Sequence, residues 1–319
     1  MKTLFIADWH IKLKTKGIPD TWAINRFNIL VLEIYKVIQE ENIEQLVLGG
    51  DTFDRLPTLE ELALFFGFIE NINIPTYIIE GNHEATRKGE TFLKVINTLV
   101  KNPLVHFILE FKTINGIDYI PYCKLKEWTT NPESFNSNIL VTHVRGEIPP
   151  HVKPEIDLSL FDRWDVVFAG DLHSHSNSQR NIVYPGSPVT TSFHRTLVDT
   201  GAVIFDTTSP KDWKWIKFNV PQLLRKTIQA GEEMPASTFH HTVYEVEGDM
   251  SELSKVENTD LLDKKIIKRS TEASLIITPE MTLTEELVEY LRYILELPEE
   301  TIEDLVGIFN DNISKITLE

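Results

Sequence analysis

The chain has 319 residues, of which 42% are hydrophobic and 25% charged, values that are ordinary for a folded globular protein. Its formal net charge of −17 argues against polyanion binding by the whole surface, so a nucleic-acid partner would need a local basic patch, divalent metal or a helper subunit. A single cysteine, Cys123, excludes an intrachain disulfide framework and fits a reducing compartment such as the cytoplasm. No signal peptide or membrane-spanning helix is expected, because the first apolar run stops at Asp8.

The first hundred residues alternate between apolar runs and amphipathic segments. Apolar runs at 3–7, 45–50 and 75–80 predict buried strands. Apolar residues at helical spacing predict helices over about 22–41, 58–72 and 90–100. This order predicts βαβ units with right-handed crossovers, in which a functional site lies beyond the carboxyl ends of the strands.

The second half adds strands with less helix. Runs at 139–142, 165–170, 182–188 and 201–207 predict a second sheet packed on the first, which gives a layered α/β sandwich. We expect this sandwich to span 1–210, a small α+β appendage to span 211–280, and helices with a break at Pro298 to span 281–319. The apolar stripe of the last helices favours an intramolecular core, with docking to a partner helix as the alternative.

Polar side chains follow five of the predicted strands at the point where each strand ends. One such Asp or His is usually a cap or a turn residue, but five strands ending in this way favour a joint role. Mixed oxygen and nitrogen donors suit two divalent cations that share one carboxylate, an arrangement that suits phosphoester hydrolysis. A nearby histidine would then protonate the departing oxygen. The residues at these strand ends are Asp8, His10, Asp51, Asn82, His83, His143, Asp171 and His173.

These residues also carry a family resemblance over roughly residues 1–207. Asp8-x-His10, Gly50-Asp51-x-x-Asp54, Gly81-Asn82-His83-Glu84, His143 and Gly170-x-x-His173 resemble the five motifs of the calcineurin-like metallophosphoesterases. Asp8-Trp9-His10, Gly50-Asp51-Thr52-Phe53-Asp54 and Tyr184-Pro185-Gly186-Ser187-Pro188 are similar to the nuclease subunit of the SbcCD-type double-strand-break repair complex and to phage recombination nucleases. The resemblance implies a metal-dependent DNA exonuclease, with endonuclease activity as a further expectation, that acts in DNA repair or recombination.

The same resemblance implies roles for individual residues. One metal would be held by Asp8, His10, Asp51 and His173, and the other by Asp51, Asn82, His143 and position 171. His83 would donate a proton to the leaving oxygen, and Glu84 would support its imidazole. Asp54 is expected to be structural, turning the loop after its strand.

Position 171 departs from the family pattern Gly-His-x-His, because the chain reads Gly170-Asp171-Leu172-His173. Keeping the frame of the strand places Asp171 where a histidine is usual, whereas the alternative frame makes His173 and His175 the pair. We prefer Asp171, because the strand end fixes where side chains reach the site. Three carboxylates then favour Mn²⁺, or else Mg²⁺, over Zn²⁺.

Substrate and partners follow from the same reasoning. The lysines after the first motif are candidates for contacts to the DNA backbone. Alternatively, they lie in a loop that contacts only solvent. Two arginines that follow motif segments could also reach DNA. These candidates are Lys12, Lys14, Lys16, Arg145 and Arg195. The resemblance further implies a capping domain over 211–280, C-terminal helices that dock on the coiled coil of an SbcC-like ABC-type ATPase, and a homodimer.

Two other functions remain open at this point. The chain could be another phosphatase or a small phosphodiesterase, which would hydrolyse generic substrates and ignore DNA. It could also be a non-catalytic subunit in which Asp171 marks a decayed site, and such a site would bind no pair of Mn²⁺ ions.

Overall fold

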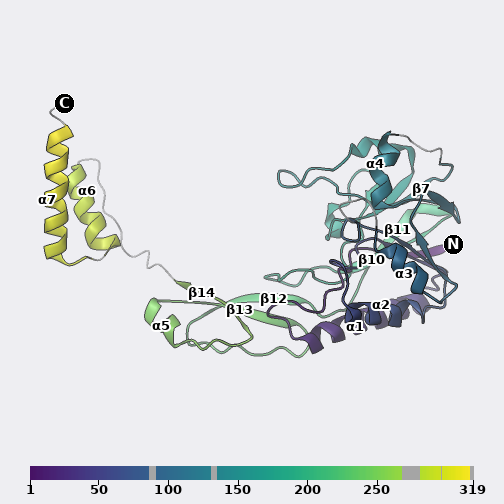
Figure 1. Cartoon of the computed structure of the whole chain (residues 1–319), viewed down its shortest axis with the longest axis horizontal. Coiled ribbons are helices and arrows are strands. Elements are labelled where there is room, and N and C mark those ends of the chain that lie inside the picture. The colour runs from purple at the N-terminus through teal and green to yellow at the C-terminus, as the bar shows by residue number, and fades with distance from the viewer. Residues whose placement is uncertain (86–90, 131–134, 268–280, 296, 317–319) are drawn as a thin grey trace. The chain divides into compact units, whose positions relative to one another are not determined.

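The computed structural model describes residues 1–85, 91–130, 135–267, 281–295 and 297–316 (Figure 1). The chain divides into two compact units. Unit 1 comprises residues 1–228, 232–246 and 257–264, and unit 2 comprises 229–231, 247–256 and 265–319. None of the described helices is long and apolar enough to cross a lipid bilayer.

The first sheet of unit 1 has six strands in the order β11-β10-β1-β2-β3-β4. They are β1 (Lys2–Ile6), β2 (Gln45–Gly49), β3 (Thr76–Ile79), β4 (Val105–Ile108), β10 (Gly201–Asp206) and β11 (Ser209–Lys217). The first four run parallel, and β10 pairs antiparallel with both β1 and β11. The connecting helices are α1 (Asp20–Glu40), α2 (Leu59–Ile69) and α3 (Leu93–Leu99), close to the predicted ranges, although residue 90 lies outside the described residues.

The second sheet has five strands in the order β5-β6-β7-β8-β9, of which β6 to β9 are parallel. They are β5 (Lys112–Ile114), β6 (Ile117–Ile120), β7 (Ile139–His143), β8 (Val166–Gly170) and β9 (Ile182–Val183). The outer face of this sheet is covered by α4 (Tyr122–Thr130) and the 3₁₀ helix η1 (Leu158–Arg163).

Alternating side chains of each strand divide the core into layers. Phe5 and Val47 of the first sheet meet Val141 and Phe168 of the second, and the Phe5 and Phe168 rings lie 5.8 Å apart. The opposite faces pack against helices, with α1 and α2 on one side and α4 on the other (Figure 1). This is the two-sheet α/β sandwich that the sequence predicts. The assignment of the run at 201–207 to the second sheet is wrong, because these residues form β10, which pairs with β1 in the first sheet.

Beyond residue 210 the chain first completes the sandwich, because β11 continues the six-stranded sheet to Lys217. A separate three-stranded sheet follows, with β12 (Leu223–Gln229), β13 (His241–Gly248) and β14 (Leu262–Ile267) in that order, and α5 (Met250–Lys255) precedes β14. Residues 268–280 of the expected appendage lie outside the described residues. The division at 210 and 280 therefore stays a prediction.

The C-terminal part of unit 2 consists of α6 (Leu283–Glu289), the π-helical turn η3 (Tyr290–Ile294) and α7 (Glu299–Ile316). Arg292 and Glu299 form an ion pair of 2.8 Å, and Leu291 and Ile302 are buried. The apolar stripe is only partly used inside the chain, because several large apolar side chains are exposed. They are Leu283, Tyr290, Tyr293, Ile294, Leu295, Leu305 and Ile308.

Candidate metal centre

The loops that follow β1 and β2 are joined by backbone hydrogen bonds. The Asp8 N–H donates to the Gly50 carbonyl at 3.1 Å, and the His10 N–H donates to the Asp51 carbonyl at 2.9 Å. Parallel strands end at the same edge of a sheet, and these bonds extend their alignment beyond the strands themselves. The two motifs are therefore held in register as one structure.

The backbone at this edge has positive φ angles at several residues that carry side chains. The φ angles are 58° at Asp8, 46° at His10, 50° at Asp51 and 103° at Asp171. Each such angle on a residue with a side chain costs about 1 kcal/mol or more and persists only where the surroundings impose it. The left-handed turns direct Asp8 and His10 to the same place while Trp9 between them is buried in the core.

Two glycines let the strand ends approach closely. A Cβ on Gly81 would lie 2.1 Å from Asp51 Oδ1, and a Cβ on Gly50 would lie 2.5 Å from His143 Nδ1. Gly50 has a φ of 94°, but Gly81 is not among the residues with positive φ. Gly81 is therefore required for space and not for a backbone angle that other residues avoid.

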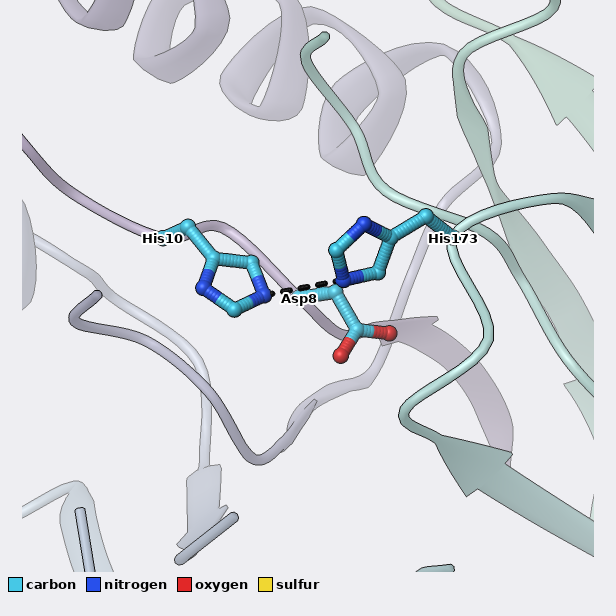
Figure 2. A group of neighbouring side chains, drawn as sticks. All are labelled: Asp8, His10 and His173. Atoms are coloured by element: carbon cyan, nitrogen blue, oxygen red, sulfur yellow. Dashed lines mark hydrogen bonds between the residues drawn. The ribbon is translucent and has the colours of Figure 1, made fainter. Parts of the chain in front are cut away.

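Asp8, His10 and His173 form the first cluster (Figure 2), and one potential ligand atom of each lies within 4.8 Å of the others. His10 Nε2 and His173 Nε2 face each other at 3.0 Å. Thr191 Oγ1 lies 3.1 Å from His173 Nδ1, and His10 Nδ1 is buried with no hydrogen-bond partner among the described residues. Burial lowers the pKa of His10 to about 3, which keeps its imidazole neutral and able to bind a cation.

Asp51 lies between the histidines of the two halves of the site. Its Oδ2 is 3.6 Å from His10 Nε2, 3.5 Å from His143 Nε2 and 3.9 Å from His83 Nε2. Asp51 thus belongs to two further clusters, one with His10 and His83 and one with Asp8 and His143. The Asp8 and Asp51 side chains are 0% and 2% exposed, and no lysine or arginine among the described residues forms an ion pair with them.

The surroundings of His143 test whether a cation fits. His143 Nδ1 lies 2.9 Å from the Gly49 carbonyl, which can only accept, so Nδ1 carries a hydrogen. His143 Nε2 then faces Asn82 Oδ1 at 2.9 Å, Asp51 Oδ2 at 3.5 Å and Asp171 Oδ1 at 4.0 Å. Burial opposes a charge on this imidazole, but Asp51, Asp8 and Asp171 outweigh it and raise the pKa of His143 well above its usual value. A proton at Nε2 thus takes the place that a metal ion would fill, and the donor set fits a divalent cation.

The structure corrects the expected role of Glu84. Its buried carboxylate accepts from three backbone N–H groups, those of Gly81 at 2.8 Å, Phe53 at 2.8 Å and Asp51 at 2.9 Å, and does not support the His83 ring. Glu84 therefore fixes the loops after β2 and β3 against each other. The His83 imidazole is instead oriented by the Asp54 carbonyl, which lies 2.6 Å from Nδ1.

The two frames for the last motif differ in where they direct their side chains. The Asp171 N–H donates to both carboxylate oxygens of Asp8, at 3.0 and 3.2 Å, and its side chain reaches His143. His175 Nδ1 lies 2.8 Å from the Tyr184 carbonyl, and its ring stacks on Trp215 at 5.5 Å. The geometry supports Asp171 as the member of the strand-end site.

Most cations suggested as substrate contacts are paired with acids. Lys12 lies 2.7 Å from Asp54, Lys14 lies 3.2 Å from Glu60, and Arg145 lies 3.3 Å from Asp171. Arg195 pairs with the buried Glu245, and its own side chain is exposed. Lys16 is exposed.

Sequence analysis alone did not single out Thr191 or Arg26. Thr191 contacts His173 from a loop that carries no recognisable pattern, so nothing in the sequence indicates this contact. Arg26 is 4% exposed on α1, between the buried Ala23, Phe27 and Leu30. A charged residue on the apolar face of an amphipathic helix is the signal that could have identified it.

Comparison with known proteins identifies the family of the chain. The model of the calcineurin-like phosphoesterase family matches residues 1–193. The chain is 38% identical to "Probable exonuclease subunit 1" of Escherichia phage T5, covering 96% of this chain and 97% of that one. It is 28% identical over 222 residues to phosphoesterase 244L of Invertebrate iridescent virus 6, covering 60% and 71% of the two chains. Among solved structures, TT1561 of Thermus thermophilus aligns with a TM-score of 0.44 at 12% identity, covering 68% of this chain and 99% of that one. The chain therefore belongs to the calcineurin-like metallophosphoesterases and is a hydrolase.

Proposed function

We propose that the protein is a Mn²⁺-dependent DNA exonuclease, with endonucleolytic cleavage as a further activity of the same site. The observation that carries this proposal is the convergence of Asp8, Asp51 and His143, from three separate strand ends, onto one small volume. The relative in phage T5 is named as an exonuclease subunit, which supports a nucleic-acid substrate. The three carboxylates, counting Asp171, support a hard cation such as Mn²⁺ or Mg²⁺.

Two cations would be held by two overlapping sets of side chains. Asp8, His10, Asp51 and His173 would hold one, and Asp51, Asn82, His143 and Asp171 would hold the other. When bound, divalent cations supply Lewis acidity toward a water molecule and toward the phosphate oxygens. Asp51 would belong to both sets, which agrees with its position between His10 and His143.

His83 has the placement that a proton donor to the leaving oxygen needs. Its Nδ1 faces the Asp54 carbonyl, which accepts only, so Nδ1 carries a hydrogen and Nε2 is the nitrogen left to face the substrate. Nε2 lies 3.9 Å from Asp51 Oδ2, at the edge of the candidate metal centre. The side chain is 37% exposed, so a substrate can reach it.

The test is release of labelled nucleotides from duplex DNA with Mn²⁺, Mg²⁺ or Zn²⁺, and with EDTA. We expect release with Mn²⁺, none with EDTA, and a rate about 10²- to 10⁴-fold lower for His83→Asn with Mn²⁺ binding retained. A matched control is His106→Asn, which changes a histidine of β4 that stacks on Tyr77. Hydrolysis of bis(p-nitrophenyl) phosphate without any action on DNA would instead identify a small phosphodiesterase. Failure to bind Mn²⁺ would identify a non-catalytic subunit.

We further propose an ABC-type ATPase of the SbcC kind as the partner, and a role in DNA repair or recombination. The part of residues 211–280 that follows β11 would cap the nuclease core, and the helices within 281–319 would dock on the coiled coil of the ATPase. The exposed apolar side chains of α6, η3 and α7 support docking, because a solvated helix pair gains nothing from them. A homodimer remains a separate prediction, which sedimentation of the purified protein would test.

A further inference from the structure

A small cavity of about 90 Å³ lies beside His10 in unit 1. Arg26 of α1 lines one side, and residues 190–193 line another. That segment contributes the hydroxyl groups of Thr190, Thr191 and Ser192. Since a single water needs about 10–15 Å³ of such volume, the cavity can hold several waters or one group of phosphate size.

Arg26 is the unusual member of this lining. Its guanidinium donates from Nη1 to the Thr190 carbonyl at 2.9 Å, whereas its buried Nε has no hydrogen-bond partner. Arg26 forms no ion pair with any residue that the structure describes, although it is 4% exposed. Its guanidinium carbon lies 4.9 Å from the centre of the Phe27 ring and 5.3 Å from that of the Trp22 ring, contacts that supply no negative charge. Burial lowers the pKa of Arg26 to about 10, so the group is still charged at neutral pH. A buried cation without an anion is costly, and an oxyanion in the cavity would remove that cost.

The other charges around the cavity leave Arg26 uncompensated. Lys12 and Asp54 also line it, but they are paired with each other at 2.7 Å and together contribute no net charge. The hydroxyl groups of Thr191 and Ser192 can each donate a hydrogen bond. A guanidinium with hydroxyl donors is the set of groups that binds phosphate oxygens well.

The cavity adjoins the metal centre through two residues. His10 belongs both to the cavity lining and to the cluster with Asp8 and His173. Thr191 lines the cavity and lies 3.1 Å from His173 Nδ1. A group held in the cavity would therefore lie next to the phosphate on which the metal centre acts.

We infer that this cavity binds the phosphate that neighbours the scissile one in the substrate strand, with Arg26 as its main contact. The inference rests on the proposed nuclease function for the identity of the strand. The observation that supports it directly is that Arg26 is buried beside a cavity of suitable size and has no anionic partner among the described residues. A single-phosphate substrate would occupy the metal centre and leave the cavity unused.

The first experiment measures binding of inorganic phosphate to the protein in EDTA, by calorimetry. We expect wild-type protein to bind phosphate, and Arg26→Met to weaken binding by about tenfold or more, since hydrogen bonds to charged groups are strong. Arg26→Lys keeps the charge and should retain part of the affinity. If the two variants at the buried position 26 fail to fold, Lys12→Met tests the same cavity from a more exposed position. Arg180→Met is the matched control, because that arginine pairs with Asp162 on the surface. Equal phosphate binding by wild type, Arg26→Met and Lys12→Met would overturn the inference.

The second experiment distinguishes a phosphate of the strand from free phosphate. An oligonucleotide series carries one uncharged methylphosphonate at each position in turn, and hydrolysis of bis(p-nitrophenyl) phosphate is followed in parallel. In the wild type, we expect a methylphosphonate at one position beside the cleaved bond to raise KM about tenfold. In Arg26→Met, the same methylphosphonate should leave KM unchanged, and hydrolysis of the small substrate should be the same for both proteins. Loss of phosphate binding in Arg26→Met without any such position would overturn the assignment to the strand. If no oligonucleotide is cleaved at all, the proposed nuclease function fails, and phosphate binding in the first experiment still decides whether the cavity is an anion site.

Discussion

The strand-end site of unit 1 and the C-terminal helices of unit 2 depart from ordinary protein anatomy in opposite ways. In the first, carboxylates such as Asp8 and Asp51 are buried without a lysine or arginine among the described residues to pair with them. In the second, apolar side chains such as Leu305 and Ile308 are left in water. Both arrangements cost free energy in the isolated chain, because each leaves a group in the wrong medium.

The comparison teaches that an unfavourable environment points to the kind of ligand that would relieve it. Buried carboxylates and imidazole lone pairs are relieved by cations, and exposed apolar side chains are relieved by another apolar surface. The two regions also differ in the interactions that hold their side chains in place. Left-handed residues and the carboxylate of Glu84 fix the metal site, whereas the polar contacts between the C-terminal helices include exposed pairs, Thr284 of α6 with Asn310 of α7 and Arg292 of η3 with Glu299 of α7.

Removing the shared carboxylate should have the largest effect. Asp51→Asn keeps the side-chain shape and tolerates the φ of 50°, since asparagine adopts left-handed angles readily. We expect Mn²⁺ affinity to fall by more than about 100-fold and phosphodiester hydrolysis to be lost. This loss of affinity exceeds the roughly 10- to 100-fold that is typical of residues that only orient a metal ligand. Calorimetry with Mn²⁺ and hydrolysis of bis(p-nitrophenyl) phosphate measure the two effects. Asp162→Asn, on the surface, is the control, and a variant at position 51 that binds two Mn²⁺ ions normally would contradict the bridging role.

Filling the space between two strand ends should have the next largest effect. Gly81→Ala places a Cβ 2.1 Å from Asp51 Oδ1 and 2.5 Å from the Asp51 nitrogen, and the backbone must move to accept it. We expect a loss of about 1–3 kcal/mol in the free energy of unfolding and about a 100-fold loss of activity from displacement of Asp51. Urea unfolding and initial rates measure both.

Gly67→Ala is the matched control for this substitution. Gly67 lies within α2, and a Cβ there meets nothing within 4 Å. Since alanine is the better helix former, this variant should gain about 0.5–1 kcal/mol and keep full activity. If the two alanine variants behave alike, close approach of the strand ends is not what Gly81 provides.

Much of the fold could be predicted from the sequence, because the signals that specify it are local. Apolar runs and helical periodicity place β1 to β3 and α1 to α3 within a few residues, and polar residues at the strand ends indicate the edge that carries the site. The left-handed angles at Asp8 and His10 could not be predicted, since hydrogen bonds to the loop after β2 stabilise them. The contact of Thr191 with His173 likewise depends on tertiary structure alone.

The smallest expected effect concerns the exposed apolar side chains of α7. Leu305 and Ile308 are three residues apart and so lie on one face of the helix, 38% and 60% exposed. If the proposed ATPase partner binds here, replacing both with serine should weaken binding to its coiled coil by about tenfold for each side chain buried there, with hydrolysis of bis(p-nitrophenyl) phosphate unchanged. Glu303→Ser, an exposed change on the same helix, is the control, and calorimetry against the isolated coiled coil is the measurement. Unchanged binding by the double variant would mean that these exposed apolar residues form no binding surface. An unfavourable environment would then indicate a ligand at the metal centre but not at the C-terminal helices.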